Sequence, residues 1–160
     1  MPKSPKKILA IVNPISGSGK GKKKWPLIYR RLLDDLGPVE FEYTNASGHA
    51  MILAQEALKE GVEMIIAVGG DGTINEVVNG FFDKGKLISS KAVLGILPTG
   101  TGSDLVKTLN VPKKIDDQIR LLKSRRTKKI DIGLAKYKSH DGKAQSRYFL
   151  NLASAGIGGD

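Results

Sequence analysis

The stretch that decides the fold is Met64-Ile65-Ile66-Ala67-Val68-Gly69-Gly70-Asp71-Gly72-Thr73. Its first five residues are apolar and end at a pair of glycines, a pattern typical of a short strand buried on both faces of a sheet. The glycines permit a tight turn and let a ligand approach the backbone closely. Helical periodicity follows over residues 73–82. The sequence therefore predicts a strand, a turn and a helix whose N-terminus suits a phosphate group.

Asp71 sets the chemistry expected of this turn. A bare carboxylate beside a phosphate would repel it. The conflict disappears if Asp71 holds Mg²⁺, directly or through water, or accepts a proton from an attacking hydroxyl. The plainer alternative is a structural turn in which Asp71 only caps the helix. Because strand, turn and helix occur together, we favour the functional interpretation.

Two further glycine-rich loops also follow apolar strands, which are predicted over residues 8–12 and 93–97. The loops are Asn13-Pro14-Ile15-Ser16-Gly17-Ser18-Gly19-Lys20 and Pro98-Thr99-Gly100-Thr101-Gly102-Ser103-Asp104. The first lacks the spacing of a Walker A motif and on its own is typical of a flexible loop, although Lys20 has the reach to contact phosphate oxygens. Asp104 is either a second acid near a metal or the N-cap of the next helix. Three such loops at one sheet edge predict a nucleotide cleft.

Strands and helices alternate along the first 127 residues. Further helices are predicted over residues 25–36, 49–58, 104–109 and 115–122, and a further strand over residues 39–43. This order implies βαβ units and a mostly parallel, Rossmann-like sheet of the α/β class. From residue 128 the pattern changes to two strands, over residues 130–137 and 147–155, joined by a segment containing the hairpin dipeptide Asp141-Gly142. We interpret residues 1–127 as a nucleotide-binding domain and residues 128–160 as the start of an incomplete β domain.

Composition limits the classes of function. The 160 residues include no cysteine, which excludes disulfides and thiolate metal sites. No run approaches the roughly 20 apolar residues that cross a bilayer, so we expect a soluble protein, and the absence of cysteine fits the reducing cytoplasm. The net charge is +10, and basic residues gather in residues 20–24 and 113–129. These clusters are either solvated surface or sites that attract polyanions or anionic lipid headgroups, which would give peripheral membrane contact.

Nucleic acid is disfavoured as a partner because the basic runs lack interleaved aromatic residues and no recognition motif accompanies them. Nothing in the sequence indicates an oligomeric state. Asp131 is either a strand-edge carboxylate or a third member of an acidic cluster. Asn75, Glu76 and Asn79 follow the Asp71 turn and have the simplest interpretation of solvated helix residues.

Together these loops resemble the diacylglycerol kinase catalytic domain family, which includes bacterial lipid kinases and sphingosine kinases. The matching residues are Asn13-Pro14, Ser16-Gly17, Gly19-Lys20, Thr44, His49-Ala50, the run from Gly69 to Thr73, the run from Asn75 to Gly80, Leu97-Pro98, Gly100-Thr101 and Asp104. Leu150-Asn151 and Gly156 resemble the start of its second domain. The resemblance implies a Rossmann-like domain followed by a β-sandwich, truncated here, with ATP in the cleft between them.

The resemblance also implies the roles of individual residues. Those lining the nucleotide would be Asn13, Ser16, Gly17, Gly19, Lys20, Thr44, Gly69, Gly70, Gly72, Thr73, Glu76, Thr99, Gly100 and Thr101. Asp71, Asp104 and Asp131 match acids associated with Mg²⁺ or its water network, and in some branches the acid matching Asp71 is regarded as the catalytic base. Asp160 falls where long-chain base kinases carry an acid near the lipid headgroup. Ser103 and Leu105 depart from the Asn and Phe of many members, which leaves the identity of the lipid open.

The implied function is transfer of the γ-phosphoryl group of ATP to a hydroxyl of diacylglycerol or a related lipid, with catalysis by positioning and electrostatics. An NAD kinase is one alternative because that related family shares Gly-Gly-Asp-Gly. The Asn-Pro-x-Ser-Gly and Glu-Val-Val-Asn-Gly segments favour the lipid branch. A nucleotide-binding module without turnover is the other alternative, and we expect these 160 residues alone to be inactive.

Overall fold

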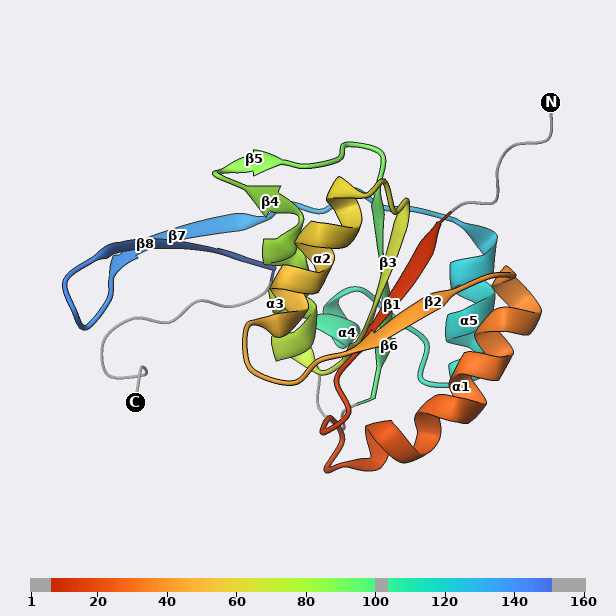
Figure 1. The fold of residues 1–160 in the computed structure, drawn as a ribbon. Coiled ribbons are helices and arrows are strands. Elements are labelled where there is room, and N and C mark those ends of the chain that lie inside the picture. The colour runs from red at the N-terminus through yellow and green to blue at the C-terminus, as the bar shows by residue number, and fades with distance from the viewer. Residues whose placement is uncertain (1–6, 100–103, 151–160) are drawn as a thin grey trace.

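The central element is a four-stranded parallel sheet. The structure is a computed structural model that describes residues 7–99 and 104–150, apart from the side chain of Lys20. The strands lie in the order β2-β1-β3-β6 (Figure 1). Their bounds are β1 Ile8–Val12, β2 Glu40–Tyr43, β3 Met64–Gly69 and β6 Val93–Pro98. The Rossmann-like α/β class expected from the sequence is confirmed.

Burial differs sharply between the middle and the edges of this sheet. Every residue of β1 and β3 is buried, as expected for strands covered on both faces. At one edge, β2 is mostly exposed, and at the other, β6 alternates between half-buried and buried residues. The second edge is therefore only partly covered.

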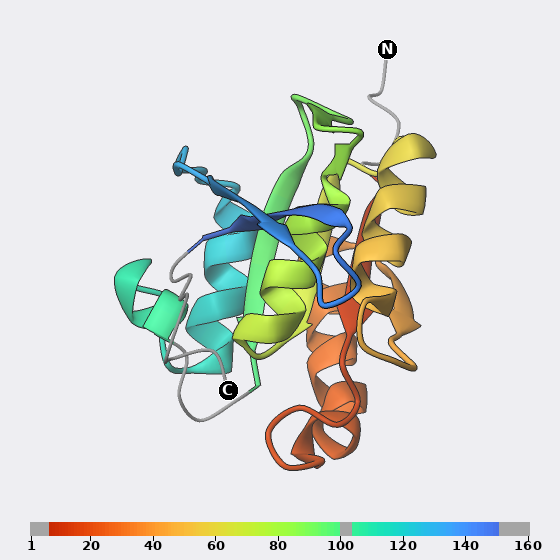
Figure 2. The same ribbon diagram turned by 90° about the vertical axis from the view of Figure 1, so that its left-hand side faces the viewer.

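Helices cover both faces of the sheet (Figure 2). One layer contains α1 (Lys20–Leu36) and α5 (Ile115–Ser124), and the other contains α2 (His49–Lys59) and α3 (Asp71–Gly80), while the short α4 (Asp104–Thr108) follows β6. Alternate strand residues serve the two cores: Ala10 and Ile66 belong to the first, Ile11 and Ile65 to the second. This alternation follows from the side-chain period of two in a strand. In the described part of the chain, no helix has the length and apolar character needed to cross a membrane.

Two small antiparallel pairs complete the described chain. One joins β4 (Phe82–Asp83) to β5 (Lys86–Leu87), and the other joins β7 (Gly133–Lys138) to β8 (Ala144–Phe149). The predicted hairpin around Asp141-Gly142 is confirmed, with Gly142 at a φ of +79°. The division of the chain into domains at residue 127 stays a prediction.

The bounds of two helices, α1 and α3, differ most from those predicted. The first helix begins at Lys20, five residues before the predicted start, so Pro26 lies inside it and removes the N–H that would bond the carbonyl of Lys22. Loop carbonyls explain the early start, because Ser16 accepts from the Gly21 N–H at 3.1 Å and Pro14 from the Lys22 N–H at 3.2 Å. The α3 helix begins at Asp71 and ends at Gly80, so Phe82 belongs to β4.

Candidate functional site

The candidate site lies where the carboxyl ends of β1, β3 and β6 meet. The chain runs from β1 outward to β2, then returns to β3 on the other side of β1. Such a reversal of strand order opens a crevice between the two neighbouring strands, and ligands of α/β sheets bind there. Each of these three strands leads directly into one of the glycine-rich loops predicted from the sequence.

Asn13 connects the first loop to the second. Its backbone N–H donates to the Val68 carbonyl at 2.9 Å, which extends the pairing of β1 with β3 by one residue. Its side-chain Nδ2 donates to Oγ1 of Thr73 at 3.0 Å. Thr73 lies in the first turn of α3 and is only 6% exposed, so this bond is partly shielded from water. The contact fixes the first loop against the start of α3.

Ser16 connects the first loop to the third. Its hydroxyl donates to the Asn13 carbonyl at 2.7 Å and lies 2.5 Å from Oγ1 of Thr99. Because the Ser16 proton is directed at Asn13, the Thr99 hydroxyl is the donor of the second bond. The Thr99 N–H in turn donates to the Gly69 carbonyl at 3.2 Å. The three loops therefore form one hydrogen-bonded unit.

Two glycines allow this close approach. Gly17 has a φ of +61°, and a Cβ added there would lie 2.3 Å from the Thr99 carbonyl oxygen. A Cβ on Gly69 would lie 2.5 Å from Oγ1 of Thr73. By contrast, Gly70 and Gly72 border open space, since a Cβ on either would meet nothing within 4 Å. The backbone at the start of α3 is therefore accessible to a ligand.

The start of α3 has the electrostatics of an anion site. Gly70 is its N-cap and offers no side-chain cap. The N–H groups of a first helical turn lack partners within the helix, and the helix dipole places partial positive charge there. Asp71 occupies the first helical position and is half-buried, so its carboxylate also lies in this favourable field. The same place thus combines phosphate donors with an oxygen ligand for a cation.

The three predicted metal ligands are not gathered in one cluster. Asp104 lies in the first turn of α4 and pairs with Lys107 at 3.0 Å, with both side chains exposed. Asp131 is exposed in the segment before β7. Within residues 7–99 and 104–150, no group of three or more His, Cys, Asp or Glu residues is placed to hold a metal ion. A metal bound here would need ligands besides a carboxylate cluster, such as water or the oxygens of a bound phosphate.

Glu76 has a structural contact that the sequence did not indicate. It projects from α3 to the start of α2, where its carboxylate accepts from the Gly48 N–H at 2.8 Å and from the Ala50 N–H at 3.3 Å. The N-cap of α2 is Gly48, which has no side chain to do this. Glu76 therefore supplies the cap from another helix. Thr44, after β2, has its N–H bonded to the Val12 carbonyl at 2.9 Å, which places it at the same sheet edge.

Asn79 was expected to be a solvated helix residue, and that expectation is wrong. It is half-buried, and its side chain pairs with the backbone of Tyr148 in β8 as a neighbouring strand would. Its Nδ2 donates to the Tyr148 carbonyl at 2.8 Å, and its Oδ1 accepts from the Tyr148 N–H at 2.9 Å. The Tyr148 ring stacks on Phe82 at a centroid distance of 3.8 Å. These contacts fix the β7–β8 hairpin to the far end of the helix that begins at Asp71.

Four expected site residues are described in part or not at all. Gly100, Thr101 and Asp160 lie outside the described residues. Lys20 begins α1, but its side chain lies outside the description. Gly19, before it, is the N-cap of α1 with a φ of +78°.

Comparison with known proteins decides the family. Residues 7–135 match the model of the diacylglycerol kinase catalytic domain. The chain belongs to this family. It is 37% identical over 147 residues to a diacylglycerol kinase of Staphylococcus haemolyticus. The alignment covers 91% of this chain and 40% of that protein. It is 34% identical over 152 residues to a diacylglycerol kinase of Staphylococcus aureus, covering 94% and 44%.

A solved structure of a relative supports the fold assigned to this member of the diacylglycerol kinase family. The crystal structure of a diacylglycerol kinase from Bacillus anthracis superposes with a TM-score of 0.71 at 30% identity, covering 91% of this chain and 46% of that one. The chain thus spans less than half the length of these relatives. The family resemblance drawn from the three loops is confirmed.

Proposed function

We propose that this chain is the nucleotide-binding part of a kinase that transfers the γ-phosphoryl group of ATP to the hydroxyl of diacylglycerol or a related lipid. The observation that carries the proposal is the hydrogen-bonded unit of the three loops, in which Asn13, Ser16 and Thr99 join the loops beside the open start of α3. Family membership supports the choice of a lipid kinase over other nucleotide-binding proteins.

The loops would hold the phosphates and leave the reacting group near Asp71. Backbone N–H groups of the α3 start would bind phosphate oxygens. The nucleotide-lining roles implied for the loop glycines, Thr44 and Glu76 are part of this proposal. Since Glu76 already accepts two backbone N–H groups, its contribution would be to position the α2 start beside the nucleotide.

Mg²⁺ fits the donor set that Asp71 offers. Magnesium in phosphoryl-transfer sites is commonly held by one or two carboxylates together with substrate phosphates, so three clustered acids are not required. When bound, Mg²⁺ would neutralise charge on the phosphates. We assign the main ligand role to Asp71, with acceptance of the proton from the lipid hydroxyl as its alternative role. Asp104 and Asp131 stay predictions as outer members of this site.

The lipid side of the reaction is proposed from the family and from charge. The substrate hydroxyl would approach from a β domain that begins near residue 128, with Asp160 as a proposed contact of the lipid headgroup. A basic surface on a protein with a net charge of +10 supports peripheral contact with an anionic membrane from the cytoplasmic side.

Phosphoryl transfer from radiolabelled ATP tests the proposal. The complete gene product containing this chain would be assayed with diacylglycerol, sphingosine and NAD as separate acceptors. We expect a labelled lipid, and we expect Asp71→Asn to remove most of the activity. Asp34→Asn, on α1, is the control for loss of one carboxylate. Labelled NAD in place of lipid would select the NAD kinase alternative, and ATP binding without any transfer would select the module without turnover.

A further inference from the structure

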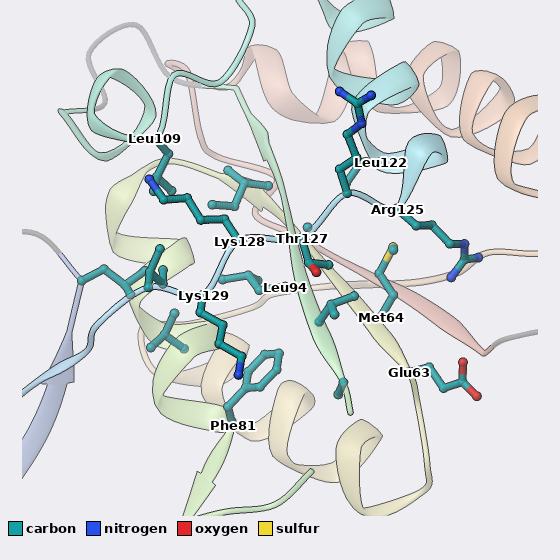
Figure 3. Close-up of a pocket in the computed structure, with 18 of the residues that line it drawn as sticks. Glu63, Met64, Phe81, Leu94, Leu109, Leu122, Arg125, Thr127, Lys128 and Lys129 are labelled. Carbon is teal, nitrogen blue, oxygen red and sulfur yellow. The ribbon is translucent and has the colours of Figure 1, made fainter. Parts of the chain in front are cut away.

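A groove of about 560 Å³ lies along β6, at the edge of the sheet (Figure 3). Its walls come from the end of α3, where Phe81 lies, and from the end of α5, where Leu122 lies. The segment of residues 125–132 crosses it between α5 and β7. The volume falls within the range of about 300–1,000 Å³ that small-molecule sites occupy. Its lining includes none of the loop residues that the structure describes, so the groove is separate from the described part of the candidate nucleotide site.

Several exposed apolar side chains are grouped in this groove. Four of the large apolar residues exposed on the described surface line it: Leu87, Leu121, Ile130 and Ile132, with exposed fractions of 49%, 42%, 38% and 38%. The floor adds Leu94 and Ile96 of β6, which stay half-buried although β3 beside them is fully buried. Grouped exposed apolar surface of this kind marks a binding site more often than scattered single residues do.

Positive charge surrounds this apolar floor. The lining contains one carboxylate, Glu63, and five cationic side chains: Lys91, Arg125, Arg126, Lys128 and Lys129. Across the described ranges, none of these five cations takes part in an ion pair. Figure 3 shows Lys128 extending toward Leu109 and Lys129 toward Phe81, so their charges lie along the groove on opposite sides of the crossing segment.

An apolar floor with a cationic rim selects an amphiphile. A nucleotide or nucleic acid would leave the apolar residues uncovered. The two aromatic residues of the lining are poorly placed for stacking on a base, because Phe81 is buried and the Phe82 ring is already stacked on Tyr148. A neutral lipid would cover the floor and leave the cations unpaired. A ligand with an apolar chain and an anionic headgroup satisfies both parts of the lining.

We propose that this groove binds one lipid molecule that carries a phosphate headgroup, with its chain against Leu94 and Ile96 and its phosphate among Arg125, Lys128 and Lys129. Charge complementarity identifies the occupant, because the cations outnumber the single carboxylate of the lining by four. The site differs from the place of phosphoryl transfer, and its occupancy requires neither ATP nor Mg²⁺. The inference therefore stands independently of the proposed function.

Titration of the 160-residue chain with octanoyl lysophosphatidate, without ATP, tests this site. Octanoylglycerol supplies the chain without the charge, and inorganic phosphate supplies the charge without the chain. We expect the lipid phosphate to bind at one site at least about tenfold more tightly than either partial ligand. Amide resonances of residues 92–96 and 127–130 are expected to shift, while those of residues 13–19 keep their positions.

A pair of double variants separates this groove from general attraction between charges. Lys128→Gln with Lys129→Gln removes two rim cations and is expected to weaken lipid phosphate binding about tenfold or more, since each basic residue near an anionic lipid contributes roughly fivefold. The matched control, Lys136→Gln with Lys138→Gln, removes the same charge from exposed positions of β7 and is expected to change affinity by less than about twofold. Equal weakening by both pairs, equal binding of inorganic phosphate, or no lipid binding to the folded chain would each overturn the proposal.

Discussion

Replacement of Gly17 by alanine perturbs the junction of the first and third loops more directly than other single changes. Gly17 has a φ of +61°, and an added Cβ would meet the Thr99 carbonyl oxygen at 2.3 Å. Ordinary van der Waals contact begins near 3.4 Å, so the two loops must separate by about 1 Å. The hydrogen bond between Ser16 and Thr99, now 2.5 Å long, would then reach the limit at which such a bond persists.

Two contributions set the expected loss of stability, and a third sets the expected loss of ATP affinity. Left-handed backbone costs a residue other than glycine about 1–2 kcal/mol. Loss of the Ser16–Thr99 hydrogen bond removes a further contribution of about 0.5–1.5 kcal/mol. A displacement of about 1 Å in a positioned site can reduce function by about 100-fold. We therefore expect Gly17→Ala to lower the free energy of unfolding by about 2–3 kcal/mol and to weaken ATP binding by at least about tenfold.

Gly37→Ala is the matched control for this prediction. Gly37 ends α1 with a φ of +83°, and a Cβ there would meet nothing within 4 Å. It also has a positive φ, so alanine there strains the backbone without the clash, and it lies outside the three loops. Urea unfolding and calorimetric titration with ATP and Mg²⁺ would be measured for both variants. We expect Gly37→Ala to lose stability through backbone strain and to keep the ATP affinity of the parent chain.

The reasoning about the loop junction is refuted if Gly17→Ala behaves like Gly37→Ala. Equal losses of stability and unchanged ATP affinity would mean that the contact between Gly17 and Thr99 does not position the nucleotide. A larger loss of stability with unchanged ATP affinity would make the junction structural only.

Three further changes test other parts of the structure. Glu76→Gln removes the charge at the start of α2 and is expected to lower the unfolding free energy by about 1 kcal/mol in urea titration, and an unchanged value would exclude the capping role. Asn79→Leu removes both bonds to Tyr148, so amide exchange in β7 and β8 should quicken about tenfold while β3 keeps its protection; unchanged exchange would mean that the hairpin is held otherwise. The hydrogen bond from Lys123 lowers the pKa of Asp35 in the folded chain. The ionised Asp35 therefore stabilises the fold fully above the ordinary aspartate pKa near 3.9, and this stabilisation is lost as the pH falls through the lowered pKa of the folded state. The melting temperature of Asp35→Asn should therefore approach that of the parent chain in acid, and a constant gap would contradict this.

Strand β2 could be predicted from its period-two alternation, and the other three parallel strands, β1, β3 and β6, could be predicted because each is a short apolar run that ends at a glycine, proline or polar turn residue. That pattern places the three loops at one edge of the sheet, and the structure brings Asn13, Ser16 and Thr99 together there. Local sequence did not indicate where α1 begins, since its lysine-rich first turn has no apolar periodicity. That start depends on carbonyl groups of the preceding loop, which accept from the Gly21 and Lys22 N–H groups.

The β4–β5 hairpin was missed for a reason of turn chemistry. Its two central residues, Lys84 and Gly85, both have positive φ, at 48° and 78°. The sequence of such a turn is usually Asn-Gly or Asp-Gly, whereas Lys-Gly is a weaker indication of a hairpin. Helical periodicity therefore extends the predicted α3 to Phe82, which belongs to β4.

The partners of Glu76 and Asn79 could not be read from local pattern. Asn79 meets Tyr148 across 69 residues of sequence, and Glu76 meets Gly48 across 28. Periodicity describes which face of a helix a residue occupies but not which distant backbone group will lack a partner. The groove beside β6 could not be predicted for the same reason. Its lining brings together residues that are distant in sequence, because residues 125–132 cross the edge of the sheet.

Calorimetric titration of the 160-residue chain with ATP, with and without Mg²⁺, tests the central claim most directly. The account predicts saturable binding at one site that strengthens with Mg²⁺ and weakens in Asp71→Asn. Absence of ATP binding in a chain that circular dichroism shows to be folded would contradict the claim that the three loops form a nucleotide site.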